Sequence, residues 1–324
     1  MKYGTIPYVK QNVSRLIFGT MVGSFPEGEN EDDLLDAALA MGINTFDLAR
    51  VYGKAEETFG NWMEKRQNRN KLVILTKCGH PSSDWEKRIN EAAIRSDFEE
   101  STRLLHTDYI DIYILHRDDP SVPAGEIVEW FNAMHAEGKI GAFGGSNWTH
   151  TRIEEANEYA YVHNLIPFSV SSPNFSLAKA VNGDVWGGGS VSITGEENQE
   201  ARDWYGKHDM PVIAYSSLAH GFLSGKLKYG DREKETEILD PFAVKGYSCD
   251  ENYERLRRCE ELAKKKNLSV AQIALAWLFV QDLNVFAAVG SSKKERMEQN
   301  AAAVEIQLTK EEAQYLNLER DQAI

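Results

Sequence analysis

The sequence predicts an α/β protein folded as a single (β/α)8 TIM barrel. About eight short apolar runs alternate with helical patterns along 324 residues, which indicates a parallel sheet. The runs are apolar throughout, as expected for strands covered on both faces. An open doubly wound sheet is the alternative, but no strand–turn–helix junction carries the G-x-G-x-x-G of a Rossmann phosphate loop. No linker rich in Pro, Gly or Ser divides the chain, so we expect residues 1–324 to form one domain.

The expected strands are short β-prone segments, several of which end at a polar residue. Ile43, Thr45 and Phe46 mark one of them, which leaves the core at Asp47. The eight segments cover residues 14–20, 43–47, 71–78, 109–116, 139–147, 167–176, 211–217 and 284–292.

The expected helices show the terminal signals that helices favour. The helix over 31–42 has an acidic first turn and Gly42 at its end, and the one over 123–138 begins near a proline and ends at a glycine. The complete set is 31–42, 56–66, 84–106, 123–138, 149–164, 197–209, 252–267, 269–282, 293–304 and 310–318. We expect variable loops at about 181–196, which is glycine-rich, and about 224–250, which is polar.

Composition limits the classes of partner. The net charge is −14 and no basic patch is evident, which argues against nucleic acid and anionic membranes. An anionic cofactor would therefore need a local basic pocket. The first 20 residues lack the apolar core of a signal peptide, and no run approaches the roughly 18 apolar residues of a membrane span. The three cysteines show no metal-ligand spacing, so we expect reduced thiols and a cytoplasmic protein.

Four titratable side chains fall at or just after three consecutive strand ends. Reactive groups of barrel enzymes gather at the C-terminal ends of the strands. Asp47, Lys77 and His116 occupy such ends, and Tyr52 follows the first by a short loop. Other polar residues at strand ends are Ser146 with Asn147, Ser172, Tyr215 with Ser216, and Ser291.

These four residue types suit proton donation to a carbonyl oxygen. A tyrosine with its ordinary pKa near 10 is a weak acid at neutral pH, and a neighbouring lysine ammonium is expected to lower that pKa. A carboxylate would hold the lysine, and a neutral histidine would orient the substrate oxygen. Each residue alone also fits a structural role, such as a helix cap or loop anchor. Lys77 alone would also suit a Schiff-base aldolase. His80 and Cys78 near His116 match no metal-ligand pattern, so no metal is expected.

Six segments contain the strand ends and the loops that follow them. They are FDLARVYG (46–53), LTKCG (75–79), YIDIYILHRDDP (109–120), GKIGAFGGSNW (138–148), VIAYSSLAHGFLSGK (212–226) and GSSKKERMEQN (290–300). Through these motifs, which come in family order along nearly its whole length, the chain resembles the aldo-keto reductases. The resemblance is closest to the bacterial branch of general-stress and inositol-operon reductases, which is related to the potassium-channel β subunits. It implies a (β/α)8 barrel that reduces aldehydes or ketones with NADPH (NADP+), with Tyr52 as general acid.

The resemblance also implies a set of cofactor-binding residues. Ser146 and Asn147 match the pair that binds the carboxamide, Tyr215 matches the aromatic that stacks on the nicotinamide, and Arg296 suits a 2′-phosphate. The full set is Thr20, Asp47, Ser146, Asn147, Ser172, Tyr215, Ser216, Leu218, Lys226, Gly290, Ser292, Arg296 and Asn300.

Three positions depart from the family pattern. Ser172 replaces the usual glutamine near the carboxamide, Gln299 replaces an acidic residue at the adenine end, and Gly290 stands where some branches have a lysine. A preference for NADP over NAD then depends mainly on Arg296, with Lys226, Lys293 or Lys294 as further candidates.

Aromatic residues on variable loops are the expected substrate contacts, namely Phe25, Trp85, Trp148 and Trp186. They predict an apolar pocket for a small carbonyl compound. A nicotinamide-binding sensor or scaffold with little turnover, like a channel β subunit, is the alternative function.

Overall fold

The computed structural model describes residues 1–181, 186 and 189–322. Eight parallel strands follow one another in the order β10-β3-β4-β5-β6-β7-β8-β9, and the order closes into a barrel. The predicted (β/α)8 fold class is therefore confirmed. The strands are β3 (Leu16–Gly19), β4 (Thr45–Asp47), β5 (Val73–Cys78), β6 (Ile110–Leu115), β7 (Ile140–Ser146), β8 (Val170–Ser172), β9 (Val212–Ala214) and β10 (Val285–Val289).

The chain divides into two compact units, and its organisation as a single domain stays a prediction. The N-terminal unit comprises residues 3–172 and 290–294, and the C-terminal unit comprises residues 1–2, 173–289 and 295–324. Strands β3 to β8 belong to the N-terminal unit, whereas β9 and β10 belong to the C-terminal unit.

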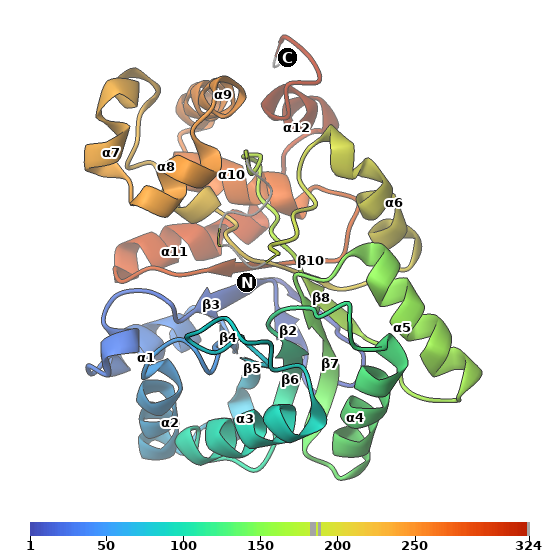
Figure 1. Ribbon diagram of the computed structural model, residues 1–324. Coiled ribbons are helices and arrows are strands. Elements are labelled where there is room, and N and C mark those ends of the chain that lie inside the picture. Colours follow the sequence, from blue (N-terminus) through green and yellow to red (C-terminus); the bar gives the residue numbers. More distant parts are fainter. Residues whose placement is uncertain (182–185, 187–188, 323–324) are drawn as a thin grey trace. The chain divides into compact units, whose positions relative to one another are not determined.

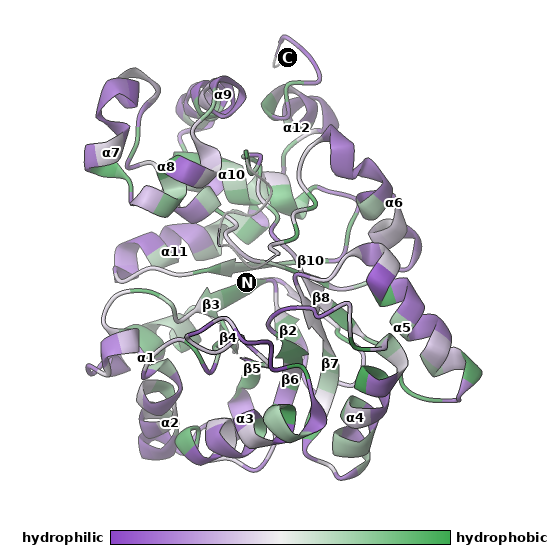
Figure 2. Ribbon diagram, in the orientation of Figure 1, coloured by the Kyte–Doolittle hydropathy of each residue, from purple (hydrophilic) through white to green (hydrophobic). Residues whose placement is uncertain are grey.

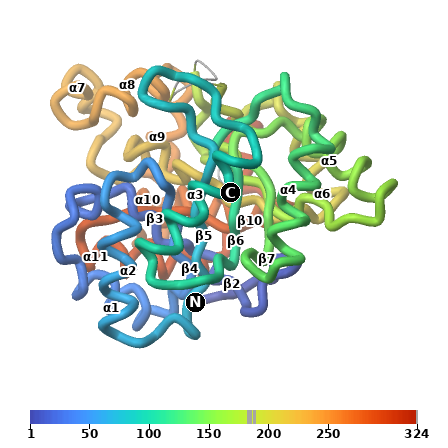
Figure 3. Tube along the Cα trace, turned by 60° about the horizontal axis from the view of Figure 1, so that its bottom comes forward, coloured from blue at the N-terminus to red at the C-terminus, as the bar shows by residue number. Residues whose placement is uncertain are grey.

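The helices of the N-terminal unit alternate with its strands (Figure 1). Helix α2 packs against α3, and α4 lies beside α5 (Figures 1 and 3). The α2–α3 contact requires a glycine, because a Cβ atom on Gly60 would lie 2.0 Å from the carbonyl oxygen of Leu104. The helices are α1 (Asp32–Ala40), α2 (Ala55–Arg66), α3 (Glu91–Leu104), α4 (Ala124–Ala136) and α5 (His150–Val162).

The strands of this unit are buried along their length. Every residue of β5, β6 and β7 is buried, and Figure 2 shows apolar colouring along parts of these strands. The predicted pattern of strands covered on both faces is therefore found. Lys77 pairs in register with Ile114, and Ser146 with Ser172, so consecutive strand ends lie side by side.

The helices of the C-terminal unit include two that the sequence did not indicate. The connection expected over 224–250 contains α7 and α8. Helix α8 begins where Asp240 accepts hydrogen bonds from the backbone N–H groups of Phe242 and Ala243, with Pro241 in its first turn. The helices are α6 (Gln199–Lys207), α7 (Glu235–Ile238), α8 (Pro241–Tyr247), α9 (Asp250–Lys266), α10 (Val270–Phe279), α11 (Lys294–Ala302) and α12 (Lys310–Leu316).

Two further boundaries differ from expectation. The helix predicted over 84–106 begins only at Glu91, because Asn90 caps it by accepting from the N–H of Ala93 at 2.9 Å, and Trp85 has φ +61° in the preceding turn. The N-terminal arm, expected to be irregular, forms an antiparallel pair of short strands, β1 (Tyr3–Gly4) and β2 (Val13–Ser14).

Short 3-10 segments complete the described chain, at Phe25–Glu27, Arg69–Lys71, Glu196–Asn198, Ala219–Gly221, Tyr229–Lys234 and Ala303–Glu305. Among the described residues, no helix has the length and apolar character needed to cross a membrane.

Candidate active site

Asp47, Tyr52 and Lys77 meet at the ends of β4 and β5 in the N-terminal unit. The ammonium group of Lys77 donates to a carboxylate oxygen of Asp47, to the carbonyl oxygen of Leu48 at 2.9 Å, and to the hydroxyl oxygen of Tyr52 at 3.2 Å. Lys77 is 3% exposed and Asp47 is 7% exposed. An ammonium group has three N–H bonds, and each has a protein acceptor here.

This arrangement excludes Lys77 as the acceptor of the Tyr52 proton. Because the Tyr52 oxygen accepts from Lys77, the phenolic hydrogen must point toward a different acceptor. Burial alone would lower the pKa of Lys77, but the charge of Asp47 and the Tyr52 hydroxyl together raise it above its ordinary value. Lys77 therefore stays an ammonium ion at neutral pH and remains a donor to Tyr52.

The pKa of Tyr52 differs in direction from the prediction. Burial raises this pKa, and the opposing effect of the Lys77 charge is smaller, so the net pKa lies above the ordinary tyrosine value. The Lys77 charge does act to lower this pKa, as expected, but the prediction did not include the larger cost of moving a phenolate out of water. Tyr52 thus remains protonated at neutral pH, which is the form that a proton donor requires.

His116 follows β6 and lies beside Tyr52. The two rings meet edge to face with centroids 5.9 Å apart. Burial, followed by the charges of Lys77 and other neighbours, holds the pKa of His116 well below its ordinary value, so the ring is neutral. Within the described chain, its Nδ1 is buried without a hydrogen-bond partner. A buried N–H without a partner is rare, so the proton is best placed on Nε2, which can donate to a ligand.

The residues expected to hold a carboxamide gather beside His116. Asn147 donates from its side chain to the carbonyl oxygen of His116 and to the hydroxyl of Ser146, both at 3.1 Å. The Ser146 hydroxyl donates to the carbonyl oxygen of Ser172 at 2.9 Å. Thr20 lies at the end of β3, where its hydroxyl donates to the carbonyl oxygen of Asp47 at 2.9 Å. Asn147 and Thr20 thus hold the backbone of two members of the tetrad Asp47, Tyr52, Lys77 and His116, namely His116 and Asp47.

The packing around Gly290 leaves no room for the lysine that some branches of the family have at this position. A Cβ atom on Gly290 would lie 2.9 Å from the carbonyl oxygen of Gly19 and 3.0 Å from a methyl carbon of Val22. A lysine at this position would therefore need a backbone shift. Ser292, two residues later, is exposed.

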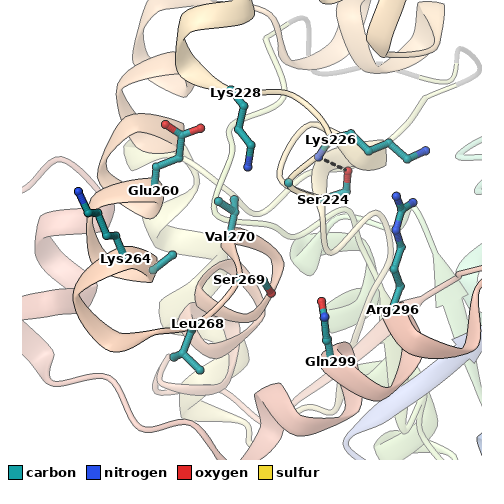
Figure 4. A pocket seen from close by; sticks show the side chains of 12 residues that line it. Ser224, Lys226, Lys228, Glu260, Lys264, Leu268, Ser269, Val270, Arg296 and Gln299 are labelled. Carbon is teal, nitrogen blue, oxygen red and sulfur yellow. Dashed lines mark hydrogen bonds between the residues drawn. The ribbon is translucent and has the colours of Figure 1, made fainter.

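The C-terminal unit contains a basic cavity of about 470 Å³ (Figure 4). Arg296 and Gln299 extend from α11 toward the loop that carries Ser224 and Lys226. Its charged lining residues are four cations, Lys226, Lys228, Lys264 and Arg296, and one carboxylate, Glu260. No ion pair neutralises these cations within the part of the chain that the structure describes. A chain of net charge −14 thus has the local basic pocket that an anionic ligand needs.

The remaining predicted cofactor residues belong to the same unit. Tyr215 and Leu218 are half-buried, and Ser216 between them has φ +51°, which turns the chain sharply after β9. Asn300 is buried on α11, one residue after Gln299.

Two of the four aromatic substrate candidates are packing residues. Phe25 and Trp148 are fully buried, and the Trp148 indole donates to the carbonyl oxygen of Arg117 at 3.4 Å. Neither presents surface to a substrate, and this part of the prediction is corrected. Trp85 is 54% exposed and keeps its candidate role.

Trp186, the remaining candidate, belongs to an aromatic cluster in the C-terminal unit. It stacks on Phe242 with ring centroids 5.0 Å apart and meets His220 edge to face at 4.6 Å. Phe242 and His220 were not among the predicted site residues, because only the fold brings these separated positions together. Residues 182–185 and 187–188 of the predicted glycine-rich loop lie outside the described residues.

Comparison with known proteins gives consistent matches. The family model described as "Aldo/keto reductase family" matches residues 15–318. The "Uncharacterized oxidoreductase YrpG" of Bacillus subtilis (strain 168) is 29% identical over 331 residues, covering 98% of this chain and 95% of that protein. "Protein tas" of Escherichia coli (strain K12) is 26% identical, covering 96% and 95%. The "Versiconal hemiacetal acetate reductase" of Aspergillus parasiticus is 28% identical, covering 98% and 96%.

Proposed function

Because the chain belongs to the aldo/keto reductase family, we propose that it reduces an aldehyde or ketone to the alcohol with NADPH, using Tyr52 as general acid. The observation that carries this proposal is the set of three acceptors around the Lys77 ammonium group. It leaves the Tyr52 proton directed away from Lys77, available to a substrate oxygen.

The side chains divide the work of such a reduction. The hydride for the carbonyl carbon is supplied by the reduced nicotinamide when it is bound. As the carbonyl oxygen gains negative charge, Tyr52 gives it a proton, and the neutral His116 donates a hydrogen bond that holds the oxygen in place. Lys77 stabilises the phenolate that Tyr52 becomes, and Asp47 keeps Lys77 charged and oriented.

The basic cavity supports the choice of NADPH. Arg296 offers a planar set of N–H donors that suits a phosphate, and Lys226, Lys228 and Lys264 add positive charge around the same space. The 2′-phosphate of NADPH would be attracted by these charges, and NADH lacks this phosphate. We therefore expect tighter binding of NADPH than of NADH.

Titration of the purified protein with NADPH and NADH, followed by turnover with a panel of aldehydes, tests the proposal. We expect NADPH to bind more tightly and to be oxidised when aldehyde is added. Tight binding without turnover on any carbonyl would contradict the reductase and favour a sensor or scaffold. Absence of nicotinamide binding would contradict both, and borohydride trapping of a substrate on Lys77 would indicate Schiff-base chemistry instead.

A further inference from the structure

A second histidine, His80, lies against the ring of His116. His80 stands two residues beyond the end of β5, and its ring meets the His116 ring edge to face with centroids 4.8 Å apart. His116 in turn meets Tyr52, so the three rings form a row. His80 has no role in the proposed reduction itself, although it contacts His116, the residue proposed to orient the carbonyl.

The backbone that carries His80 is held on both sides by one ion pair, in which the carboxylate is buried and the guanidinium is half-buried. Asp97 on α3 accepts from the N–H of Gly79 at 2.9 Å and from the guanidinium of Arg88 at 2.7 Å. Arg88 also donates to the carbonyl oxygen of His80 at 3.3 Å. Gly79 has φ +65°, and a Cβ atom there would lie 2.8 Å from a methyl carbon of Ile89. The ring of His80 is therefore presented by a fixed turn.

The hydrogen bond of His80 identifies which ring nitrogen carries the proton. Its Nδ1 lies 2.9 Å from the carbonyl oxygen of Pro81, and because a carbonyl oxygen only accepts, Nδ1 must be the donor. Burial lowers the pKa of His80, which keeps the ring neutral at neutral pH. The other nitrogen, Nε2, is then an acceptor. It has no hydrogen-bond partner among the described residues and is not a buried atom.

We propose that His80 determines substrate specificity by accepting a hydrogen bond from a hydroxyl group on the carbon next to the substrate carbonyl. This inference rests on the proposed function. His116 can donate from Nε2 to a carbonyl oxygen, and the His80 ring against it carries a lone pair on its own Nε2, so the two neighbouring rings offer opposite hydrogen-bond roles. An α-hydroxy aldehyde or ketone carries the complementary acceptor and donor on adjacent carbon atoms. The preferred substrates are therefore α-hydroxycarbonyl compounds.

The test compares 2-hydroxypropanal with 2-methylpropanal, in which a methyl group replaces the hydroxyl at similar size. The readout is kcat/KM for 2-hydroxypropanal divided by kcat/KM for 2-methylpropanal, both measured with NADPH. For His80→Phe, which has no acceptor, we expect this ratio to fall about 3- to 10-fold, as for the loss of one neutral hydrogen bond. His80→Gln retains an acceptor oxygen and should recover part of the preference. His163→Gln, an exposed position at the end of α5, is the matched control and should keep the wild-type ratio.

Each result has a defined meaning. A ratio that is equal in wild type and His80→Phe overturns the inference while leaving the reductase proposal intact. A fall in both kcat/KM values with an unchanged ratio shows that His80 only supports the fold around His116, which also overturns it. Failure of the wild-type protein to reduce either aldehyde, or any other carbonyl, contradicts the proposed function itself.

Discussion

Removal of the positive charge at Lys77 should weaken both the fold and the reaction. Lys77→Met keeps the length of the side chain but leaves Asp47, which is 7% exposed, without its ammonium partner. It also removes the donors to the Leu48 carbonyl oxygen and to the Tyr52 hydroxyl. Breaking a buried ion pair by removing one partner costs about 3–5 kcal/mol of stability. At roughly 2 °C per kcal/mol, the Tm should fall by about 6–10 °C.

The pH dependence of this loss has a definite sign. Burial already raises the pKa of Asp47, against the opposing charge of Lys77, and the variant lacks that opposing charge. When the folded-state pKa of a carboxyl is raised, its protonated form favours the folded state. This stabilisation is fully present below the unfolded-state pKa of about 3.9 and is lost as pH rises through the folded-state pKa. The variant should therefore be least destabilised in acid and increasingly destabilised as pH rises toward neutrality.

Urea unfolding between pH 5 and pH 8 measures this effect, with Lys71→Met at an exposed position before β5 as the control. The double variant Lys77→Met with Asp47→Asn should recover part of the lost stability, because the buried carboxylate is gone. Additive losses in the double variant, or a loss independent of pH, would refute the account of an uncompensated charge at Asp47.

Two further predictions concern the cofactor pocket and the helix layer. Arg296→Gln should weaken NADPH binding by about 10- to 100-fold, as for the loss of a hydrogen bond to a charged group, and leave NADH binding nearly unchanged. Titrations with both nucleotides measure this, with Arg103→Gln at an exposed position as the control. Equal weakening of NADPH and NADH binding would contradict the assignment of Arg296 to the 2′-phosphate. Gly60→Ala should lower the free energy of unfolding in urea by about 1–3 kcal/mol, because the new Cβ atom meets the Leu104 carbonyl oxygen. The control Gly230→Ala, with open space around it, should lower this free energy little. Equal effects of the two substitutions would contradict the close packing of α2 against α3.

The barrel could be predicted from the sequence because strands and helices show themselves in local, periodic patterns of apolar residues. Apolar runs of strand length alternate with helical patterns, and the strands that result are buried on both faces. The ends of the strands follow from the same pattern, so Asp47, Lys77 and His116 could be predicted from the sequence. Helices α7 and α8 were missed because their short segments carry almost no periodic signal, although Asp240 followed by Pro241 is a helix-start pattern.

The burial of individual side chains was harder to predict from the sequence than the positions of strand ends. Trp148 and Phe25 follow strand ends on the chain, yet both are enclosed by the core, which sequence proximity to the site does not reveal. The pKa of Tyr52 was misjudged for the same reason, since the extent to which a loop residue is removed from water depends on distant segments. His80 belongs to the segment 80–85 that the sequence offered for the substrate face, but its contact with His116 could not be predicted, because it depends on the turn made by Gly79.

The central claim is that Tyr52 supplies the proton, and Tyr52→Phe tests it most directly. Turnover of an aldehyde with saturating NADPH should fall by about 10²- to 10⁴-fold, the usual contribution of a positioned acid, while NADPH still binds. Tyr161→Phe, an exposed tyrosine on α5, should behave as the wild-type protein. Turnover of Tyr52→Phe equal to that of the wild-type protein would contradict the account.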